Sequence, residues 1–110
     1  MDRDLRRFPR IASQHAVLVK RLGGAEIEEF AATTTVGLGG CGFTSDERIS
    51  SGELLEILIS ARPEVISAKA RVVYTQPLAS GKHEIGVEFI GLPDLDREKI
   101  QQLLEVTDTK

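Results

Sequence analysis

The sequence contains few of the residues from which catalytic and metal sites are usually built. It has one cysteine, two histidines and no tryptophan among 110 residues. The single thiol, Cys41, cannot form an internal disulfide or a two-cysteine metal motif, and we expect it to be a small buried hydrophobic residue. His15 and His83 are isolated from other metal ligands, and no serine or pair of carboxylates lies in a catalytic motif. These absences predict a protein that is not an enzyme, binds no metal and needs no cofactor.

Long apolar runs are also absent, and the first residues are charged. A signal peptide needs about seven or more apolar residues in succession and a membrane helix about 20, so we expect a cytoplasmic protein without membrane insertion. Aromatic residues are scarce, with four phenylalanines and one tyrosine, and the net charge is −3. Proteins that bind RNA or single-stranded DNA use aromatic side chains on a basic face. We therefore expect no DNA or RNA partner.

Basic residues are concentrated in one short segment at the start of the chain. Arg3, Arg6, Arg7 and Arg10 fall within the first ten residues, whereas the stretch from Asp94 onward is acidic overall. A basic segment on an acidic protein indicates a local anion-binding site or a solvated tail. We expect residues 1–10 to be a flexible segment of one small domain over residues 1–110, because a chain of this length buries a single modest core.

Short segments of alternating apolar and polar residues recur along the chain and predict strands. In the clearest of them Ile66, Ala68, Ala70 and Val72 alternate with polar residues, which gives one buried and one exposed face. Turn residues such as Gly23-Gly24 separate the segments. Their regular spacing predicts an all-β barrel or sandwich of five or six strands. The predicted strands cover residues 16–22, 25–36, 54–59 and 65–75, with a last one around Ile85, Val87 and Phe89.

The end of the chain has a helical pattern instead. Asp94 follows Pro93 and is a suitable N-cap, and Ile100, Leu103 and Leu104 fall on one side of a helix. We expect a helix of about three turns over residues 94–106. Its apolar stripe has to be covered, most simply by an open end of the barrel.

A run of glycines from Gly37 to Gly42 matches the pattern G-x-G-x-x-G of dinucleotide-binding loops. In such loops the glycines join a strand to a helix whose N-terminus faces the pyrophosphate. Residues 43–51 have no helical periodicity, and a chain of this length has no room for repeated strand–helix–strand units. We therefore interpret the run as a tight turn or bulge, where glycine supplies a positive φ or lets backbones approach.

The arginines and the glycines together resemble the PilZ domain family, bacterial receptor modules for cyclic di-GMP. The R-x-x-x-R segment of that family is similar to Arg6-Arg7-Phe8-Pro9-Arg10. Its second motif, Asp/Asn-x-Ser-x-x-Gly, which runs on into a hydrophobic strand, falls on residues 35–40. Residues 54–59, 68–74 and 86–89 and the closing helix also look like the family. The resemblance implies a six-stranded antiparallel β-barrel with a C-terminal α-helix.

The resemblance also implies a ligand site for cyclic di-GMP. Arg6 and Arg10, with Arg7 between them, would bind phosphate and guanine, because an arginine fork bonds either group bidentately. Thr35, Gly37 and Gly40 would form the second half of the site. Thr35 replaces a carboxylate or amide and Gly37 replaces a serine; at about 1 to 2 kcal/mol per contact, these changes weaken binding by roughly 30- to 1000-fold.

Two functions remain open from the sequence. The first is a cyclic di-GMP receptor that signals to a protein partner in motility, biofilm formation or secretion. The second is a PilZ-like adaptor that binds its protein partner without nucleotide. We expect a monomer or a weak homodimer in either case.

Overall fold

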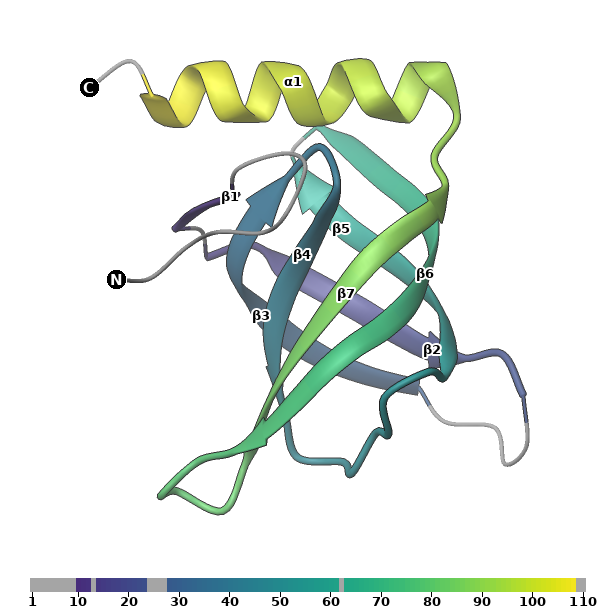
Figure 1. The fold of residues 1–110 in the computed structure, drawn as a ribbon. Helices are drawn as coiled ribbons and strands as arrows, with labels where there is room; N and C mark the ends of the chain where they lie inside the picture. The colour runs from purple at the N-terminus through teal and green to yellow at the C-terminus, as the bar shows by residue number, and fades with distance from the viewer. Residues whose placement is uncertain (1–9, 13, 24–27, 62, 109–110) are drawn as a thin grey trace, which may run out of the picture.

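Antiparallel strands make up most of the chain, as the computed structural model shows (Figure 1). The structure describes residues 10–12, 14–23, 28–61 and 63–108. Within these ranges it contains seven strands followed by one helix. Their bounds are β1 Arg10–Ala12, β2 Ala16–Arg21, β3 Glu28–Gly37, β4 Gly40–Ser45, β5 Leu54–Ala61, β6 Glu64–Pro77, β7 His83–Gly91 and α1 Asp94–Asp108.

Six of the strands close into a barrel. Hydrogen bonding runs in the order β3-β2-β5-β6-β7-β4, and β4 pairs again with β3 to complete the ring. Every pairing is antiparallel. The short strand β1 adds to β3 outside this ring. The predicted six-stranded antiparallel barrel with a C-terminal helix is therefore confirmed.

The barrel interior is filled by the residues that the alternating pattern directs inward. In β5 these are Leu55, Ile57 and Ile59, all with no exposed surface. Valine and isoleucine dominate the rest of the core, because branched side chains pack well on a pleated surface. Cys41 is buried in the same core, which confirms that prediction.

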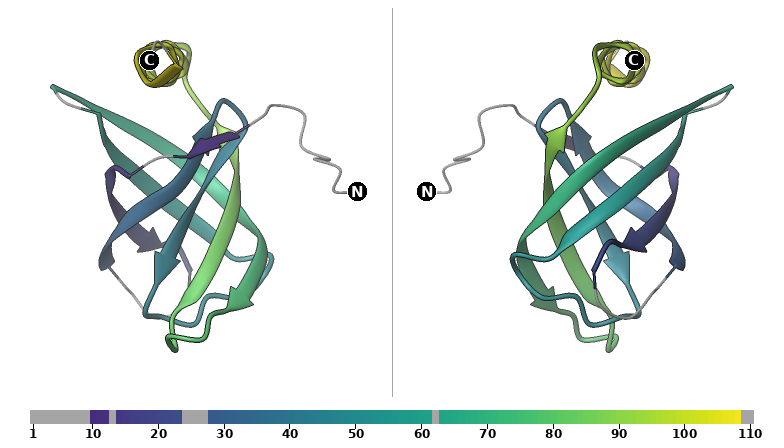
Figure 2. Two further views of the ribbon diagram at one scale, coloured as in Figure 1. Left: turned by 90° about the vertical axis from the view of Figure 1, so that its left-hand side faces the viewer. Right: turned by 90° about the vertical axis from the view of Figure 1, so that its right-hand side faces the viewer.

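Helix α1 lies across one end of the barrel (Figure 2). Ile100 has no exposed surface and belongs to the core, and Leu103 and Leu104 pack against it. The predicted role of the apolar stripe is thus confirmed. The helix is longer than the predicted three turns, since it has 15 residues and ends at Asp108. Its first hydrogen bond joins the Arg97 amide to the Pro93 carbonyl, so Pro93, not Asp94, occupies the N-cap position.

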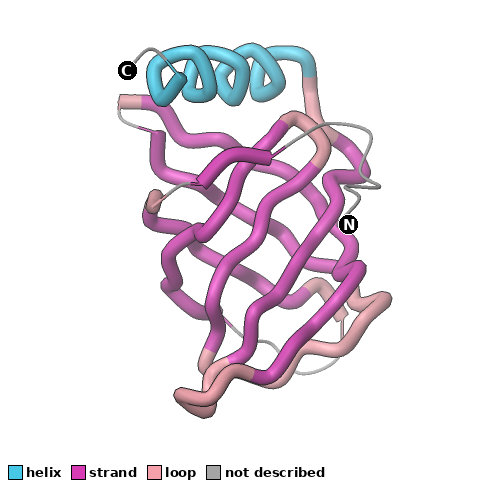
Figure 3. Tube along the Cα trace, turned by 60° about the vertical axis from the view of Figure 1, so that its left-hand side comes forward, coloured by secondary structure: helices cyan, strands magenta, loops and turns pink. Residues whose placement is uncertain are grey.

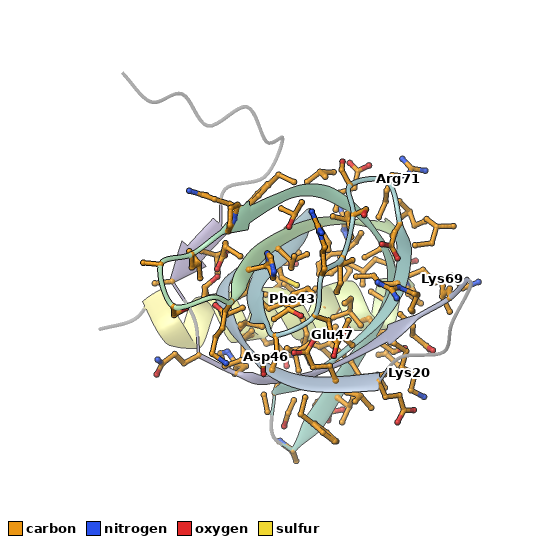
Figure 4. The ribbon with its side chains drawn as sticks, turned by 90° about the horizontal axis from the view of Figure 1, so that it is seen from below. Lys20, Phe43, Asp46, Glu47, Lys69 and Arg71 are labelled. Carbon is orange, nitrogen blue, oxygen red and sulfur yellow. The ribbon has the colours of Figure 1, made fainter. Side chains whose placement is uncertain are left out.

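Charged side chains gather at the opposite end of the barrel. The Arg21 guanidinium is directed inward, only 17% exposed, with Nε 2.6 Å from Glu53 Oε1. A second ion pair joins Lys82 to Asp46 at 2.6 Å, and the hydrogen bond and charge of Asp46 raise the pKa of Lys82. In the view along the barrel from this end, Phe43 lies inside the ring while Asp46 lies at its margin (Figure 4).

The glycine run forms the end of one strand, a turn and the start of the next. β3 ends at Gly37, Leu38 and Gly39 make the turn, and β4 begins at Gly40. The predicted tight turn is confirmed. Of the two roles considered for these glycines, a positive φ does not apply, since within the described ranges only Gly52 and Gly81 have one. The residue pattern alone did not predict β4, because glycine is unfavourable in strands.

Candidate functional site

Strand β1 brings the arginine segment to the glycine hairpin. In its pairing with β3, Arg10 lies opposite Gly37 and Ala12 opposite Thr35. Directly opposed residues of antiparallel strands have Cα atoms about 4.5 to 5.5 Å apart. The end of the first predicted motif is therefore beside the second, although 27 residues of sequence separate Arg10 from Gly37.

The remaining arginines cannot be placed in the same way. Arg6 and Arg7 lie outside the described residues, as do all residues of the predicted flexible segment except Arg10. The backbone of Arg10 forms the first residue of β1. Figure 3 shows that β1, the strand that begins at Arg10, lies beside the end of β3.

The three predicted residues of the second motif lie on both strands of the β3–β4 hairpin. Thr35 is half-buried and pairs with Gly42 of β4. Gly37 is buried at the end of β3, and Gly40 is buried at the start of β4, opposite Glu88 of β7. Hydrogen bonding of these strands thus brings Thr35, Gly37 and Gly40 within one hairpin, with Arg10 along its edge.

A bulge in β3 turns two threonines toward the same glycine. The register between β3 and β4 shifts between Thr33 and Thr35, so Thr34 is an additional residue. A bulge of this kind sets two residues of one strand against one residue of its partner. A Cβ added to Gly42 would lie 3.0 Å from Thr35 Oγ1 and 3.1 Å from Thr34 Oγ1. Both hydroxyls therefore lie close over Gly42, at a distance that only a residue without a side chain allows.

A carboxylate approaches the same surface from β7. Glu84 Oε2 lies 3.0 Å from that Cβ position and accepts a 2.7 Å hydrogen bond from Thr34 Oγ1. Glu84 Oε1 accepts a longer one, 3.3 Å, from Thr44 Oγ1. An ionised carboxylate has about four lone-pair positions, so it retains capacity to accept further hydrogen bonds. Glu84 and the two threonines over Gly42 form what we call the Gly42 cluster: Thr34, Thr35, Gly42 and Glu84.

Sequence reasoning did not identify Glu84 as part of the site. The alternation of β7 indicates that Glu84 points outward, because its neighbour Ile85 points into the core. The pattern does not indicate which strand lies beside it. That information comes from the β4–β7 pairing, in which Thr44 lies opposite Glu84.

An aromatic ring flanks the Gly42 cluster. Gly42 lies opposite Gly86 of β7, and Gly86 also lies opposite Tyr74 of β6. A Cβ on Gly86 would overlap the ring of Tyr74, so the ring covers this glycine. The tyrosine remains 37% exposed. The outer surface at this point therefore combines an aromatic ring, a carboxylate and two hydroxyls.

A separate cavity of about 620 Å³ lies between the helix and the barrel. It is lined by residues of α1, of the β5–β6 turn and of the segment before β2, including His15 and Lys99. Lys99 Nζ donates to the Val65 carbonyl at 3.2 Å and lies 3.4 Å from Glu64. Of the predicted site residues that the structure describes, none lines this cavity.

Metal sites and membrane-spanning helices are both absent from the described ranges. No three histidine, cysteine or acidic residues in them are grouped so as to hold a metal ion. None of the helical segments there has the length and apolar character needed to cross a bilayer.

The family of the protein follows from its match to a known domain. The PilZ domain model matches residues 4–106, and the chain therefore belongs to the PilZ domain family. The predicted family is confirmed. A search of curated protein sequences found no significant match.

Solved structures share the fold at low sequence identity. The inhibitor of motility MotI/DgrA of Bacillus subtilis has 18% identity and a TM-score of 0.77, with 100% of this chain and 55% of that protein covered. YcgR of Escherichia coli in complex with c-di-GMP has 13% identity and a TM-score of 0.76, covering 94% and 46%. MrkH of K. pneumonia in complex with c-di-GMP has 18% identity and a TM-score of 0.73, with 100% of this chain and 56% of that protein covered. The chain thus spans about half the length of these proteins, and the likeness shows the fold.

Proposed function

We propose that the chain is a cyclic di-GMP receptor domain that acts on a protein partner. The observation that carries the proposal is the β1–β3 pairing, which sets Arg10 opposite Gly37 and so joins the two predicted motifs. Membership of the PilZ family supports it, as do the relatives YcgR and MrkH, whose structures are described as c-di-GMP complexes.

The chemistry of the site suits this ligand. Cyclic di-GMP presents two phosphates and two guanines, and arginine forks bond either group. The Watson–Crick edge of guanine consists largely of N–H donors, for which a carboxylate is a suitable acceptor. Thr35 lacks a carboxylate, but Glu84 brings one to the same surface over Gly42. In this proposal Glu84 takes over the acceptor role, and Tyr74 offers a ring face beside it.

The ligand would act by ordering the arginine segment against the hairpin. Binding that orders a segment loses part of its free energy to that ordering, and the ordered segment presents a new surface to a partner. We expect the partner to belong to motility, biofilm formation or secretion, and the first of these is supported by MotI/DgrA, which is an inhibitor of motility. The chain then works as a receptor and not as an enzyme.

Titration calorimetry with cyclic di-GMP tests the proposal. We expect saturable binding by the unaltered chain and a loss of at least about tenfold in affinity for Arg10→Ala, since a charge-assisted contact is worth about 1.5 to 3 kcal/mol. Cyclic di-AMP, which lacks the guanine edge, should bind more weakly. Arg48→Ala is the matched control, because Arg48 is an exposed arginine in the loop between β4 and β5, away from β1.

The alternative function predicts a different result. A PilZ-like adaptor without nucleotide would give no heat with cyclic di-GMP at high micromolar concentration. Equal affinities of Arg10→Ala and Arg48→Ala would show that the arginine segment does not hold the ligand. Either result would overturn the proposal in its present form.

A further inference from the structure

The outer faces of β2 and β5 carry the same short pattern side by side. Each strand presents a leucine, a charged residue and a second leucine outward, since alternate residues point away from the core. The charged residues, Lys20 and Glu56, are directly opposed. We call this surface the β2–β5 face; it consists of Leu18, Lys20, Leu22, Leu54, Glu56 and Leu58.

This face is more apolar than a solvated surface requires. Leu22 is 47% exposed and Leu54 is 44% exposed, and their backbones are joined by a 3.0 Å hydrogen bond. On the adjoining strand β3, Phe30 lies opposite Leu18 and is 80% exposed. Single exposed apolar residues are common, but a contiguous group of them marks an interaction surface.

The charges on this side form one row across four strands. Glu28 of β3 lies opposite Lys20, Lys20 opposite Glu56, and Glu56 opposite Lys69 of β6. The signs therefore alternate along the row, beginning negative and ending positive. Glu28 and Lys20 are 3.6 Å apart, and Figure 4 shows Lys20 and Lys69 directed away from the barrel.

When a second copy of this row is turned end to end and laid against the first, each charge meets a charge of the opposite sign. A two-fold axis parallel to the strands, between β2 and β5, sets β2 of one copy against β5 of the other at the same height. Lys20 then faces Glu56 of the second copy, and Glu28 faces Lys69. The same rotation sets Leu18 against Leu58 and Leu22 against Leu54, so apolar residues also meet apolar residues. A two-fold interface requires this kind of self-complementarity.

We propose that the chain associates with a second copy of itself through the β2–β5 face. The inference goes beyond the proposed nucleotide binding and does not depend on it, because the face and the Gly42 cluster share no residue. The outside of a barrel is convex, so the central pairs carry most of the contact. These are the Lys20–Glu56 and leucine pairs, and Glu28 and Lys69 lie farther from the axis.

The size of the face indicates a weak dimer. Four strands about 4.8 Å apart and five residues of about 3.4 Å each give a footprint of roughly 300 to 350 Å² per copy. A standard stable interface covers about 800 Å² per partner. We therefore expect a dimer that dissociates on dilution, as equilibrium sedimentation of the chain over a range of concentrations would show.

A charge exchange tests the predicted pairs. Lys20→Glu leaves two carboxylates facing each other at both central positions, and Glu56→Lys leaves two ammonium groups there. Each variant alone should self-associate at least about tenfold more weakly than the unaltered chain. Mixed in equal amounts, they should form a heterodimer, since every central position then joins opposite charges. With one of the two variants uniformly labelled with ¹⁵N, native mass spectrometry distinguishes the heterodimer by mass.

Lys82→Glu is the matched control, because it reverses a lysine charge in the exposed β6–β7 turn, away from the face. It should leave self-association unchanged. Circular dichroism of each variant establishes that the barrel is folded. The proposal is overturned if the unaltered chain remains a monomer at millimolar concentration, if Lys20→Glu and Glu56→Lys self-associate as the unaltered chain does, or if their mixture forms no heterodimer.

Discussion

The two sides of the barrel follow different rules of strand pairing. In each pairing from β3 through β2 and β5 to β6, one residue lies opposite one residue and the register never shifts. On the other side, the register shifts once between β3 and β4 and twice between β6 and β7. We call these the regular and the irregular side. The β2–β5 face lies on the regular side, and the Gly42 cluster lies on the irregular one.

The difference extends to residue type. β2 and β5 of the regular side are rich in valine, leucine and isoleucine, whereas on the irregular side Gly40 begins a strand and Gly42 and Gly86 lie inside strands. Glycine weakens a strand interior and often marks a bulge or a close approach. Strand stability is therefore lower at the place where Thr35 and Glu84 approach each other over Gly42. Departures from local rules of this kind are expected at functional sites.

The largest expected effect tests whether the two sides share one core. Phe43 of the irregular side and Ile57 of the regular side are both fully buried in it. Phe43→Ala should lower the free energy of unfolding by about 3 to 5 kcal/mol and Ile57→Ala by about 2 to 5 kcal/mol. Urea denaturation should show one cooperative transition for both variants. Two separate transitions would mean that the sides unfold independently.

A smaller effect is expected from filling the space over Gly42. The added methyl group of Gly42→Ala would lie 3.0 Å from Thr35 Oγ1 and Glu84 Oε2, so these oxygens have to move. We expect a loss of about 1 to 2 kcal/mol of stability and about tenfold weaker binding of cyclic di-GMP. Gly91→Ala is the control, because no atom lies within 4 Å of the corresponding methyl position. If both variants behave alike in calorimetry, the Gly42 cluster is not part of the binding surface.

The smallest expected change in stability comes from restoring the family's second motif. Gly37 has no positive φ, so Gly37→Ser introduces no backbone strain. Thr35→Asn adds an amide without setting a second carboxylate beside Glu84. The double variant should bind cyclic di-GMP at least about tenfold more tightly while its unfolding midpoint changes little. Unchanged affinity would indicate that the hairpin holds these side chains in the wrong geometry.

The strands of the regular side were predictable from the sequence, as was β7, whereas β4 and the register shifts of the irregular side were not. Alternation of apolar residues located β2, β5 and β6 to within a few residues, because one face of each strand packs in the core and the other faces water. Leu54 to Ile59 was correctly assigned as a strand, since its β-branched residues and flanking turn residues outweighed a helical pattern. The buried Ile100 was likewise predictable from helical spacing.

The site depended on information that local patterns do not contain. β4 has two glycines in its first three residues, so it lacks the hydrophobic alternation that predicts a strand. The proximity of Glu84 to Thr35 arises from long-range pairing of β3 with β4 and of β4 with β7. The N-cap differed by one residue because side-chain preference favours aspartate at that position, whereas the carbonyl that accepts the first helical hydrogen bond is that of Pro93.

The attachment of β1 determines how the arginine segment can be released. β1 and β2 both pair with β3. Between them, the His15 amide donates to the Thr33 hydroxyl at 2.8 Å, and the Thr33 amide donates to the His15 carbonyl at 2.8 Å. Tension on the N-terminal side of Arg10 therefore loads the Arg10–Gly37 pair first, then the Ala12–Thr35 pair, and only then the His15–Thr33 contact. In mechanical terms, a force directed away from β3 peels β1 pair by pair, and the motif residues are the first to part.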